Sequence, residues 1–397
     1  MYLPLAVIAE MVLFAALQLV AHESGGHYLG DIEGSMLQDL PILLLLVGFG
    51  VKAGLPLLHV AMPPAYAVLP LAAAIPLAGA MLHLGLYGWL RFLPLGQMAS
   101  PGWSSVFALT GMLAMVYGVV VGLFQRDARS LLAYSSISQM GLMTLGVGIG
   151  LALPQHWLQV QAMLVLFALH HALSKGALFH GLGIQGRARL GLWLPALALA
   201  GIPLSGGALA KGLLKTQLQL PAVAEYLPGA WFLALGSVGT TLLMARFLWL
   251  ARQVRAPREQ TSVPAWWLLL GLMLCLPWLW PLPVARYSPL WDAAWPVLLA
   301  AVLVWIGTRG FIGSWLAALP AVPPGDVLVL MERGLRWLPR PLAGHAEHAR
   351  EYEAVLHPRP PPPLVTVLER LLGRWPLAIY VLVLLLLCLG MLLALGA

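Results

Sequence analysis

The chain has 397 residues, of which 60% are hydrophobic and only 9% are charged. A soluble domain carries about 25% charged residues, so the composition excludes a globular fold with a water-facing surface. The net charge of +7 does not indicate nucleic-acid binding, because the arginines gather in short loops between apolar segments, as in membrane proteins. The two cysteines, Cys275 and Cys388, are too few for a cysteine-ligated cluster or zinc finger within this chain.

Apolar segments of about 20 residues recur along the chain and must cross the bilayer as helices, because loops and open sheets cannot satisfy their backbone polar groups in lipid. The sequence predicts an all-α polytopic membrane protein. The eleven predicted spans are residues 3–21, 40–60, 68–92, 103–124, 130–153, 159–183, 192–216, 228–250, 264–282, 290–308 and 377–396. The first span contains Glu10 and lacks a basic start and a small-residue cleavage site, so we expect a membrane helix rather than a cleaved signal peptide.

The loops between these spans alternate in charge. One side of the membrane receives Arg126, Arg129, Arg187, Arg189, Arg252, Arg255, Arg258 and Arg309. The other side receives an acidic stretch with Glu23, Asp31, Glu33 and Asp39. Because arginine-rich loops stay in the cytoplasm, we expect the N-terminus on the cytoplasmic side of a bacterial inner membrane and the C-terminus outside.

Residues 310–375 differ from the spans. Residues 327–338 are apolar along one face with arginines at its edge, which predicts an amphipathic helix on the cytoplasmic membrane surface. Residues 360–363 are four prolines, a stiff spacer. Amphipathicity alone does not name a partner, so two interpretations remain: a solvated linker, or a brace that runs along a neighbouring subunit.

Ionisable side chains inside the predicted spans are functional candidates, because a charge at the centre of the bilayer costs several kcal/mol. Lys52 and Lys211 lie in spans interrupted by glycine and proline, the pattern of a transporter with related halves. A lysine beside broken backbone can load and release a proton, since low-dielectric surroundings disfavour its charged form. Histidine titrates near neutral pH and can relay protons between such sites. The candidates are Lys52, His83, His170, His171, Lys175, Lys211 and Lys215.

Other interpretations apply to some of these residues. Lys215 lies near the end of its span, where a snorkelling side chain explains it as well. His83 and His170, each taken alone, also fit a satisfied core histidine. His171 and Lys175 share one helix face. A histidine metal site is disfavoured, because adjacent helical residues such as His170 and His171 point about 100° apart and their span has no acidic residue.

Five segments in order carry a family resemblance. They are residues 48–56, 81–92, 125–141, 171–179 and 201–206. They resemble the seventh helix, the eighth helix, the helix-connecting motif, the eleventh helix and the broken twelfth helix of the proton-conducting antiporter-like membrane subunits. This family is shared by complex I, group 4 hydrogenases including formate hydrogenlyase, and Mrp-type sodium/proton antiporters. The third segment is the strongest single match.

The resemblance implies two inverted five-helix repeats with a line of charged residues and water along the membrane midplane. It places Lys52 on the family's central lysine, Lys211 on the twelfth helix, and His83 where lysine is usual. The chain begins at the position of the sixth helix, so we expect three helices of the first repeat and no fifth-helix glutamate. Glu10 is the candidate replacement, against a packed or interface-facing glutamate. A second chain that supplies the absent helices is one expectation, and a reduced, non-pumping relative is the other.

The expected organisation has five parts: a partial first repeat at residues 1–93, a second repeat at 94–250, additional transmembrane helices at 251–309, the surface helix and proline-rich linker at 310–375, and a C-terminal span at 376–397.

We therefore predict a proton-translocating or sodium/proton-translocating subunit of a complex I-like, hydrogenase-type or Mrp-type assembly, with other membrane subunits as partners. The predicted path residues are Lys52, His83, His171, Lys175 and Lys211, with Glu10, His170 and Lys215 as further candidates. No quinone, flavin, nucleotide or metal motif is evident, so any redox activity would belong to the assembly and we expect no cofactor. The alternatives are a non-pumping structural subunit, a membrane partner for inorganic-carbon uptake, and a multipass lipid transferase.

Overall fold

The computed structural model describes residues 2–26, 37–224, 231–254, 262–279, 290–307, 322–327, 329 and 383. Every regular element among these residues is a helix, which confirms the all-α prediction. Seven of the described helical segments are long and apolar enough to cross a membrane. Most of the predicted surface segment 310–375, and the last predicted span except residue 383, lie outside the described residues, so the predicted total of eleven spans stays a prediction.

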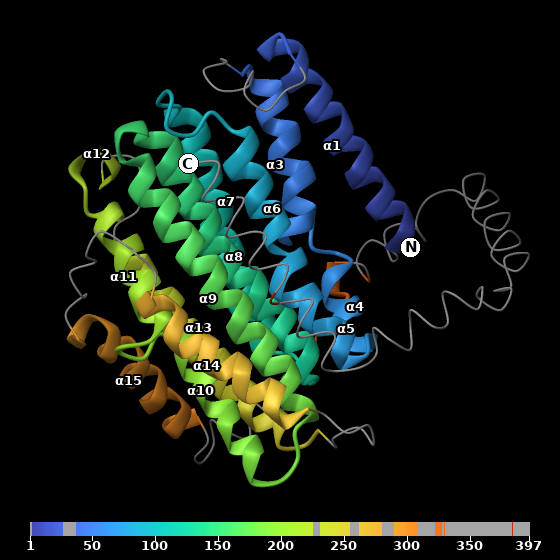
Figure 1. The fold of residues 1–397 in the computed structure, drawn as a ribbon, viewed down its shortest axis with the longest axis vertical. Helices are drawn as coiled ribbons and strands as arrows, with labels where there is room; N and C mark the ends of the chain where they lie inside the picture. Colours follow the sequence, from blue (N-terminus) through green and yellow to red (C-terminus); the bar gives the residue numbers. More distant parts are fainter. Residues whose placement is uncertain are drawn as a thin grey trace, which may run out of the picture.

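The helices follow one another without intervening strands in the described ranges (Figure 1). They are α1 (Tyr2–Ser24), α3 (Asp39–Ala53), α4 (Met62–Val68), α5 (Leu71–Pro76), the π-helix η1 (Leu77–Met81), α6 (His83–Phe92), α7 (Pro101–Leu123), α8 (Ala128–Ala152), η2 (Pro154–His156), α9 (Trp157–Gly183), η3 (Gly186–Leu192), α10 (Trp193–Ala200), α11 (Gly206–Leu218), α12 (Pro221–Ala224), α13 (Trp231–Ala251), α14 (Val263–Leu279) and α15 (Leu290–Gly307).

Helices α8 and α9 form the centre of the molecule, and almost all of their side chains are buried (Figure 1). Glycines let α7 approach α8 closely. A Cβ added at Gly111 would lie 2.4 Å from the carbonyl oxygen of Gly141, and one added at Gly118 would lie 2.5 Å from that of Tyr134. Small residues at such contacts are typical of membrane helix pairs, because the attraction comes from close packing rather than from exclusion of water.

The two predicted broken helices have the same backbone at the break. Helix α3 ends at the left-handed Gly54 (φ 73°), and α10 ends at the left-handed Gly201 (φ 94°). The amide after each glycine bonds back to a carbonyl five residues earlier, which is the Schellman arrangement that closes a helix. Three residues after each glycine, Leu57 (φ 67°) and Leu204 (φ 69°) also have positive φ. The sequence at both breaks is Gly-Leu/Ile-Pro-Leu, so one local motif is used twice.

Side-chain caps begin the helices that follow the loops. The carboxylate of Asp127 accepts hydrogen bonds from the Ser130 amide and hydroxyl, which starts α8. The hydroxyl of Ser205 accepts a bond from the Ala208 amide, which starts α11 directly after the second break. Pro101 occupies the first turn of α7, where its missing N–H costs no helical hydrogen bond. These caps fix where the central helices begin.

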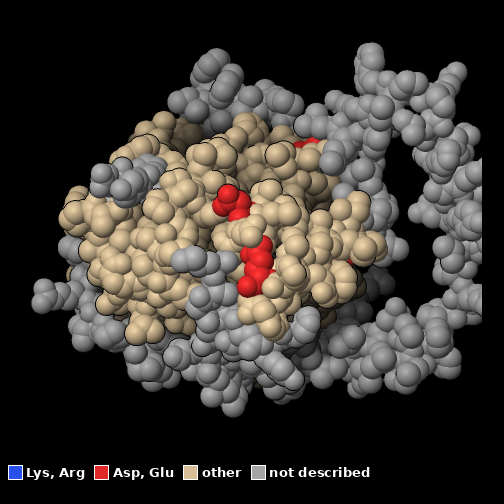
Figure 2. Space-filling model, turned by 90° about the horizontal axis from the view of Figure 1, so that it is seen from above, with Lys and Arg blue, Asp and Glu red and all other residues tan. Residues whose placement is uncertain are grey.

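One end of the molecule carries acidic side chains and no visible basic ones among its described residues (Figure 2). Helix α1 ends and α3 begins at this end (Figure 1). Glu23 accepts a hydrogen bond from the Gln38 amide there, and Asp39 accepts one from the Trp103 indole at 2.8 Å. The predicted acidic side of the membrane therefore corresponds to one end of the helix bundle.

Candidate functional site

A pair of histidines lies in the core between η1, α6 and α9. Nδ1 of His171 is 3.1 Å from Nε2 of His83, and both side chains are buried. Nδ1 of His83 is 2.9 Å from the Gly79 carbonyl oxygen in the π-helix. A carbonyl only accepts, so Nδ1 of His83 carries the proton and Nε2 is free to accept one from His171. π-helical turns of this kind often occur at functional sites.

His170 and Lys175 extend this site on α9. Lys175 is fully buried and donates a hydrogen bond to the Leu132 carbonyl of α8 at 2.8 Å. His170 lies 3.3 Å from the Ala198 carbonyl of α10, within electrostatic range of Lys211. His171 lies within electrostatic range of His83, Lys175 and His170. The adjacent histidines therefore point to different neighbours, and α9 joins the His83 side of the core to the second broken helix.

Lys211 lies at the second break. Its ammonium group donates to the carbonyl oxygens of Leu199 at 3.1 Å and Ala200 at 3.2 Å. These are the last carbonyls of α10, which lose their helical partners because the chain turns at Gly201. The broken helix thus creates the acceptors that hold a buried lysine, which is the use expected of a discontinuous membrane helix.

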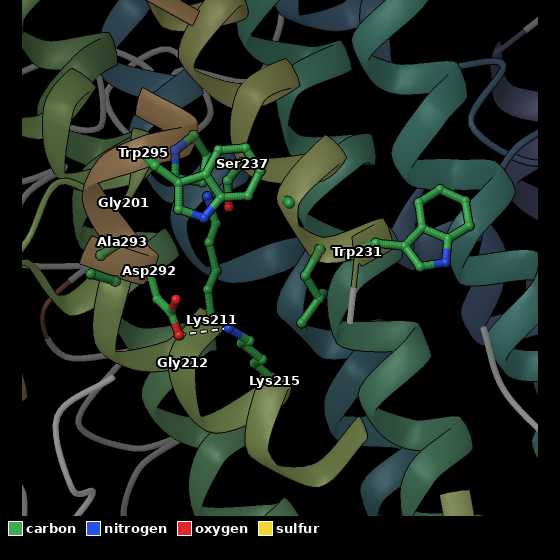
Figure 3. Close-up of a pocket in the computed structure, with 13 residues that line it drawn as sticks. Gly201, Lys211, Gly212, Lys215, Trp231, Ser237, Asp292, Ala293 and Trp295 are labelled. Atoms are coloured by element: carbon green, nitrogen blue, oxygen red, sulfur yellow. Dashed lines mark hydrogen bonds and ion pairs between the residues drawn. The ribbon is translucent and has the colours of Figure 1, made fainter. Parts of the chain in front are cut away.

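A cavity of about 180 Å³ opens beside Lys211 and contains a second lysine with a carboxylate (Figure 3). Nζ of Lys215 is 2.6 Å from Oδ2 of Asp292, which comes from the first turn of α15. Trp231 and Trp295 also line the cavity. The two charged side chains are 31% and 29% exposed, so Lys215 is paired in the wall of a cavity rather than extended alone toward the membrane surface.

Glu10 and Lys52 form a second lysine–carboxylate pair, between α1 and α3. Nζ of Lys52 is 2.5 Å from Oε1 of Glu10. The pair is far less enclosed than the histidine pair, since the Glu10 side chain is 63% exposed and that of Lys52 is 31% exposed. Large apolar residues of α1, including Ile8, Met11 and Phe14, are exposed on the same helix. Glu10 is therefore placed to accompany Lys52, at the edge of the described structure.

The predicted site residues fall into three groups. His83 pairs with His171 in the core, where His170 and Lys175 are also buried on α9 with other partners; Lys211 and Lys215 share one cavity, and Glu10 pairs with Lys52 at the edge. Two carboxylates that pair with basic side chains were not predicted: Asp292, the partner of Lys215, and Asp326, which lies near His59. Asp292 is the only acidic residue of the predicted span 290–308, so the rule that selected the lysines would have found it. Within the described ranges, no three histidine, cysteine or acidic side chains are placed to hold a metal ion.

Comparison with known proteins finds a matching family model and several relatives. A family model described as NADH:quinone oxidoreductase/Mrp antiporter, TM, matches residues 1–191. Hydrogenase-4 component B of Escherichia coli (strain K12) is 31% identical over 195 residues, which cover 46% of this chain and 29% of that protein. NADH-quinone oxidoreductase subunit M of Pseudomonas aeruginosa is 34% identical over 141 residues, which cover 35% of this chain and 26% of that protein. The chain spans less than a third of each relative.

A solved structure shares the fold over nearly the whole chain. A subunit in the structure of the Mrp complex from Dietzia sp. DQ12-45-1b superposes with a TM-score of 0.64 at 20% sequence identity. The match covers 93% of this chain and 45% of that subunit. The likeness of fold therefore extends past residue 191, where the family model ends.

Proposed function

Because the chain belongs to the family of antiporter-like membrane subunits, we propose that it carries protons across a membrane as one subunit of a larger assembly. One observation carries the proposal. A series of buried titratable groups runs from the His83–His171 pair through His170 to Lys211, and it ends at the second broken helix. Buried ionisable groups in a membrane protein are expensive and usually belong to an ion pathway.

The histidine pair has the hydrogen-bond order of a proton relay. Neutral His171 donates from Nδ1 to His83, so its Nε2 is the acceptor, and no described residue bonds to that atom. A proton that arrives at Nε2 of His171 makes an imidazolium, which passes the proton on Nδ1 to Nε2 of His83. We expect water to deliver the incoming proton, because a buried polar atom without a partner is costly and such sites are commonly hydrated.

The cavity at Lys211 is the proposed route to the acidic end of the molecule. Lys211 is hydrogen-bonded only to carbonyls among the described residues, so its proton has an acceptor once water or the Asp292 carboxylate comes within reach. Asp292 holds Lys215 at the cavity wall and provides a carboxylate that can receive protons there. In this proposal Lys175 and Lys211 load and release protons, and Lys215 with Asp292 forms the last station. Sodium is a second candidate for the transported ion, since the motifs described above also resemble those of Mrp-type sodium/proton antiporters.

The Glu10–Lys52 pair supports the proposal of a partner chain. A charged pair with a 63% exposed carboxylate is costly against lipid, and α1 presents large apolar residues around it. We propose that membrane helices of another subunit cover this face, and that they complete the first repeat at residues 1–93 beside the second repeat at 94–250. The Gly-Leu/Ile-Pro-Leu motif in both breaks supports the assignment of two repeats.

The proposed orientation follows the charged loops. The arginine-rich loops face the cytoplasm of a bacterial cell and the acidic end in Figure 2 faces outward, by the positive-inside rule. Protons that pass from Lys211 toward Lys215 and Asp292 then move outward. Residues 251–309 add helices that include Asp292, and the linker at 310–375 and the span at 376–397 remain proposed parts of the chain.

Two experiments test the proposal. Purification of the tagged native protein in mild detergent, followed by mass spectrometry, should recover other membrane subunits. Recovery as a solitary chain would contradict the assembly.

Proton flux is then measured in liposomes that contain the purified assembly. The test variant is Lys211→Met, and the control is His156→Gln, which changes a surface histidine that contacts Gln159. We expect Lys211→Met to abolish flux with the assembly intact and His156→Gln to leave it unchanged. Unchanged flux in Lys211→Met would instead favour the non-pumping structural subunit.

A further inference from the structure

A carboxylate from the segment after α15 is inserted between the first broken helix, α7 and α8. Asp326 accepts hydrogen bonds from the hydroxyls of Tyr117 on α7 and Tyr134 on α8, the latter at 2.8 Å. Nε2 of His59, which lies in the break between α3 and α4, is 3.6 Å from Oδ1 of Asp326. The Asp326 side chain is 15% exposed and that of His59 is fully enclosed. The relay proposed above uses none of these four side chains.

The cluster lies along the sides of α7 and α8 rather than at their ends. Tyr117 is six residues from the end of α7 at Leu123, and Tyr134 is six residues from the start of α8 at Ala128. At 1.5 Å per helical residue, both hydroxyl-bearing positions are about 9 Å from the loop that carries Arg126. The segment of residues 322–327 therefore reaches inward from the arginine-rich side. The hydroxyl of Tyr134 is also 3.1 Å from the Pro324 carbonyl, so Pro324 and Asp326 share its single proton.

The hydrogen bonds around His59 are complete only when both ring nitrogens carry protons. Nδ1 is 3.3 Å from the Leu55 carbonyl oxygen, which can only accept. Nε2 is 3.1 Å from the Tyr117 hydroxyl, whose single proton is directed to Asp326. A neutral ring would set the Nε2 lone pair against an oxygen lone pair and beside a carboxylate. A proton on Nε2 turns that conflict into a hydrogen bond and an ion pair.

We infer that Asp326 and His59 form a proton-dependent latch, by which protonation of His59 holds the segment of residues 322–327 against the first broken helix. Loss of that proton would leave the Nε2 lone pair facing the Tyr117 oxygen and the Asp326 carboxylate, which weakens docking. Among the described residues, the titratable groups in contact with Asp326 are His59 from the break, Tyr117 from α7 and Tyr134 from α8.

The latch would join the C-terminal part of the chain to the helix that carries Lys52, since His59 follows that helix directly. It goes beyond proton carriage by the His83–Lys211 series, and its readout is the docking of a segment rather than flux. A chain that carries no protons could still show the latch, and a proton-carrying chain could lack it. The two proposals therefore fail separately.

Hydrogen–deuterium exchange of the full chain in lipid nanodiscs tests the latch. Exchange at residues 325–329 is compared at about pH 6 and about pH 8.5, on either side of the usual histidine titration and after correction for the intrinsic pH dependence. We expect corrected exchange in the unmodified chain to rise about tenfold at the higher pH, the size of one charged hydrogen bond. In Asp326→Asn it should be fast at both pH values, and in His59→Gln the pH step should disappear.

Controls separate the latch from loss of structure. Asp39→Asn removes a carboxylate that binds Trp103 at the other end of the bundle and should keep the pH step. Protection of the α8 amides should be the same in every variant. If Asp326→Asn loses that protection, Tyr117→Phe replaces it, because that change deletes one donor and keeps the ring. The inference would be overturned if the unmodified chain showed no pH step, or if the step persisted in His59→Gln. Slow exchange in Asp326→Asn, or in Tyr117→Phe where that variant is used, would overturn it as well.

Discussion

Nδ1 of His171 and Nε2 of His83 face each other at 3.1 Å across the interface of α6 and α9. The ring planes are inclined by 64°, so the two rings form a T-shaped pair rather than a stack. The Gly79 carbonyl fixes the tautomer of His83, and His83 in turn fixes that of His171. The direction of hydrogen bonding is therefore determined by one backbone oxygen in a π-helical turn.

Substitution of either histidine should interrupt proton flux. His171→Gln keeps a donor in the site but cannot accept a proton on one side and release it on the other, so we expect about a hundredfold lower flux, as for loss of a proton-transfer group. The measurement is acidification of liposomes that contain the native assembly. His156→Gln, at the surface, should be unaffected. Flux within about twofold of the unmodified protein in His171→Gln would remove the pair from the path.

The Lys215–Asp292 pair should behave as a coupled unit at the cavity. Because each side chain is about one-third exposed, solvent screens the attraction and we expect a coupling energy of about 0.5–1 kcal/mol. A double-mutant cycle with Lys215→Met and Asp292→Asn, read from thermal unfolding of the protein in nanodiscs, measures it. Independent effects of the two substitutions would mean that the pair is not maintained in the membrane. Flux in Asp292→Asn alone should fall, since a carboxylate at the end of the path is lost.

Much of this arrangement could be predicted from the sequence, because it depends on residues that lie close together in the chain. Breaks at Gly54 and Gly201 were predictable because glycine and proline act within a few residues of themselves. The different directions of His170 and His171 followed from the helical repeat, and the structure places them against different partners. The all-α fold followed from hydropathy, because lipid leaves the backbone few alternatives.

Partners distant in sequence were not predictable in the same way. Asp326 meets Tyr117 across 209 residues, and Lys215 meets Asp292 across 77. No periodic pattern joins such positions, and a lone acidic residue after a span is indistinguishable from a solvated one. Pairing of Glu10 with Lys52 was only one of two open alternatives, because helix position does not determine which face of α1 meets α3. Tertiary packing decided each of these contacts.

The close contact of α7 with α8 predicts a sharp difference between two glycines of the same helix. Gly118→Ala should destabilise the protein by about 1–3 kcal/mol, because the new Cβ would meet backbone atoms of Tyr134 and Ser138 at 2.5 and 2.6 Å, and backbone cannot move aside cheaply. Gly102→Ala is the matched control on α7, since nothing lies within 4 Å of its Cβ. Thermal unfolding in nanodiscs provides the comparison. Equal midpoints for the two variants would contradict the packing described here.

Docking of Asp326 should also weaken in acid. Burial raises the pKa of the Asp326 carboxyl, but hydrogen bonds from His59, Tyr117, Tyr134 and the Val327 amide outweigh it and lower the pKa from 3.8 to about 2. A carboxyl whose pKa is lower in the folded protein stabilises the fold above its ordinary pKa. That contribution is lost as the pH falls from about 4 to about 2.

The acid effect is measured as the difference in stability between the unmodified chain and Asp326→Asn. That difference should include a pH-dependent part of up to about 2 kcal/mol near pH 5, which shrinks toward zero as the pH approaches 2. Other carboxyls titrate in the same range, but they are common to both proteins and cancel in the difference. A difference that stays constant from pH 5 to pH 2 would show that the Asp326 carboxylate is not held by these hydrogen bonds.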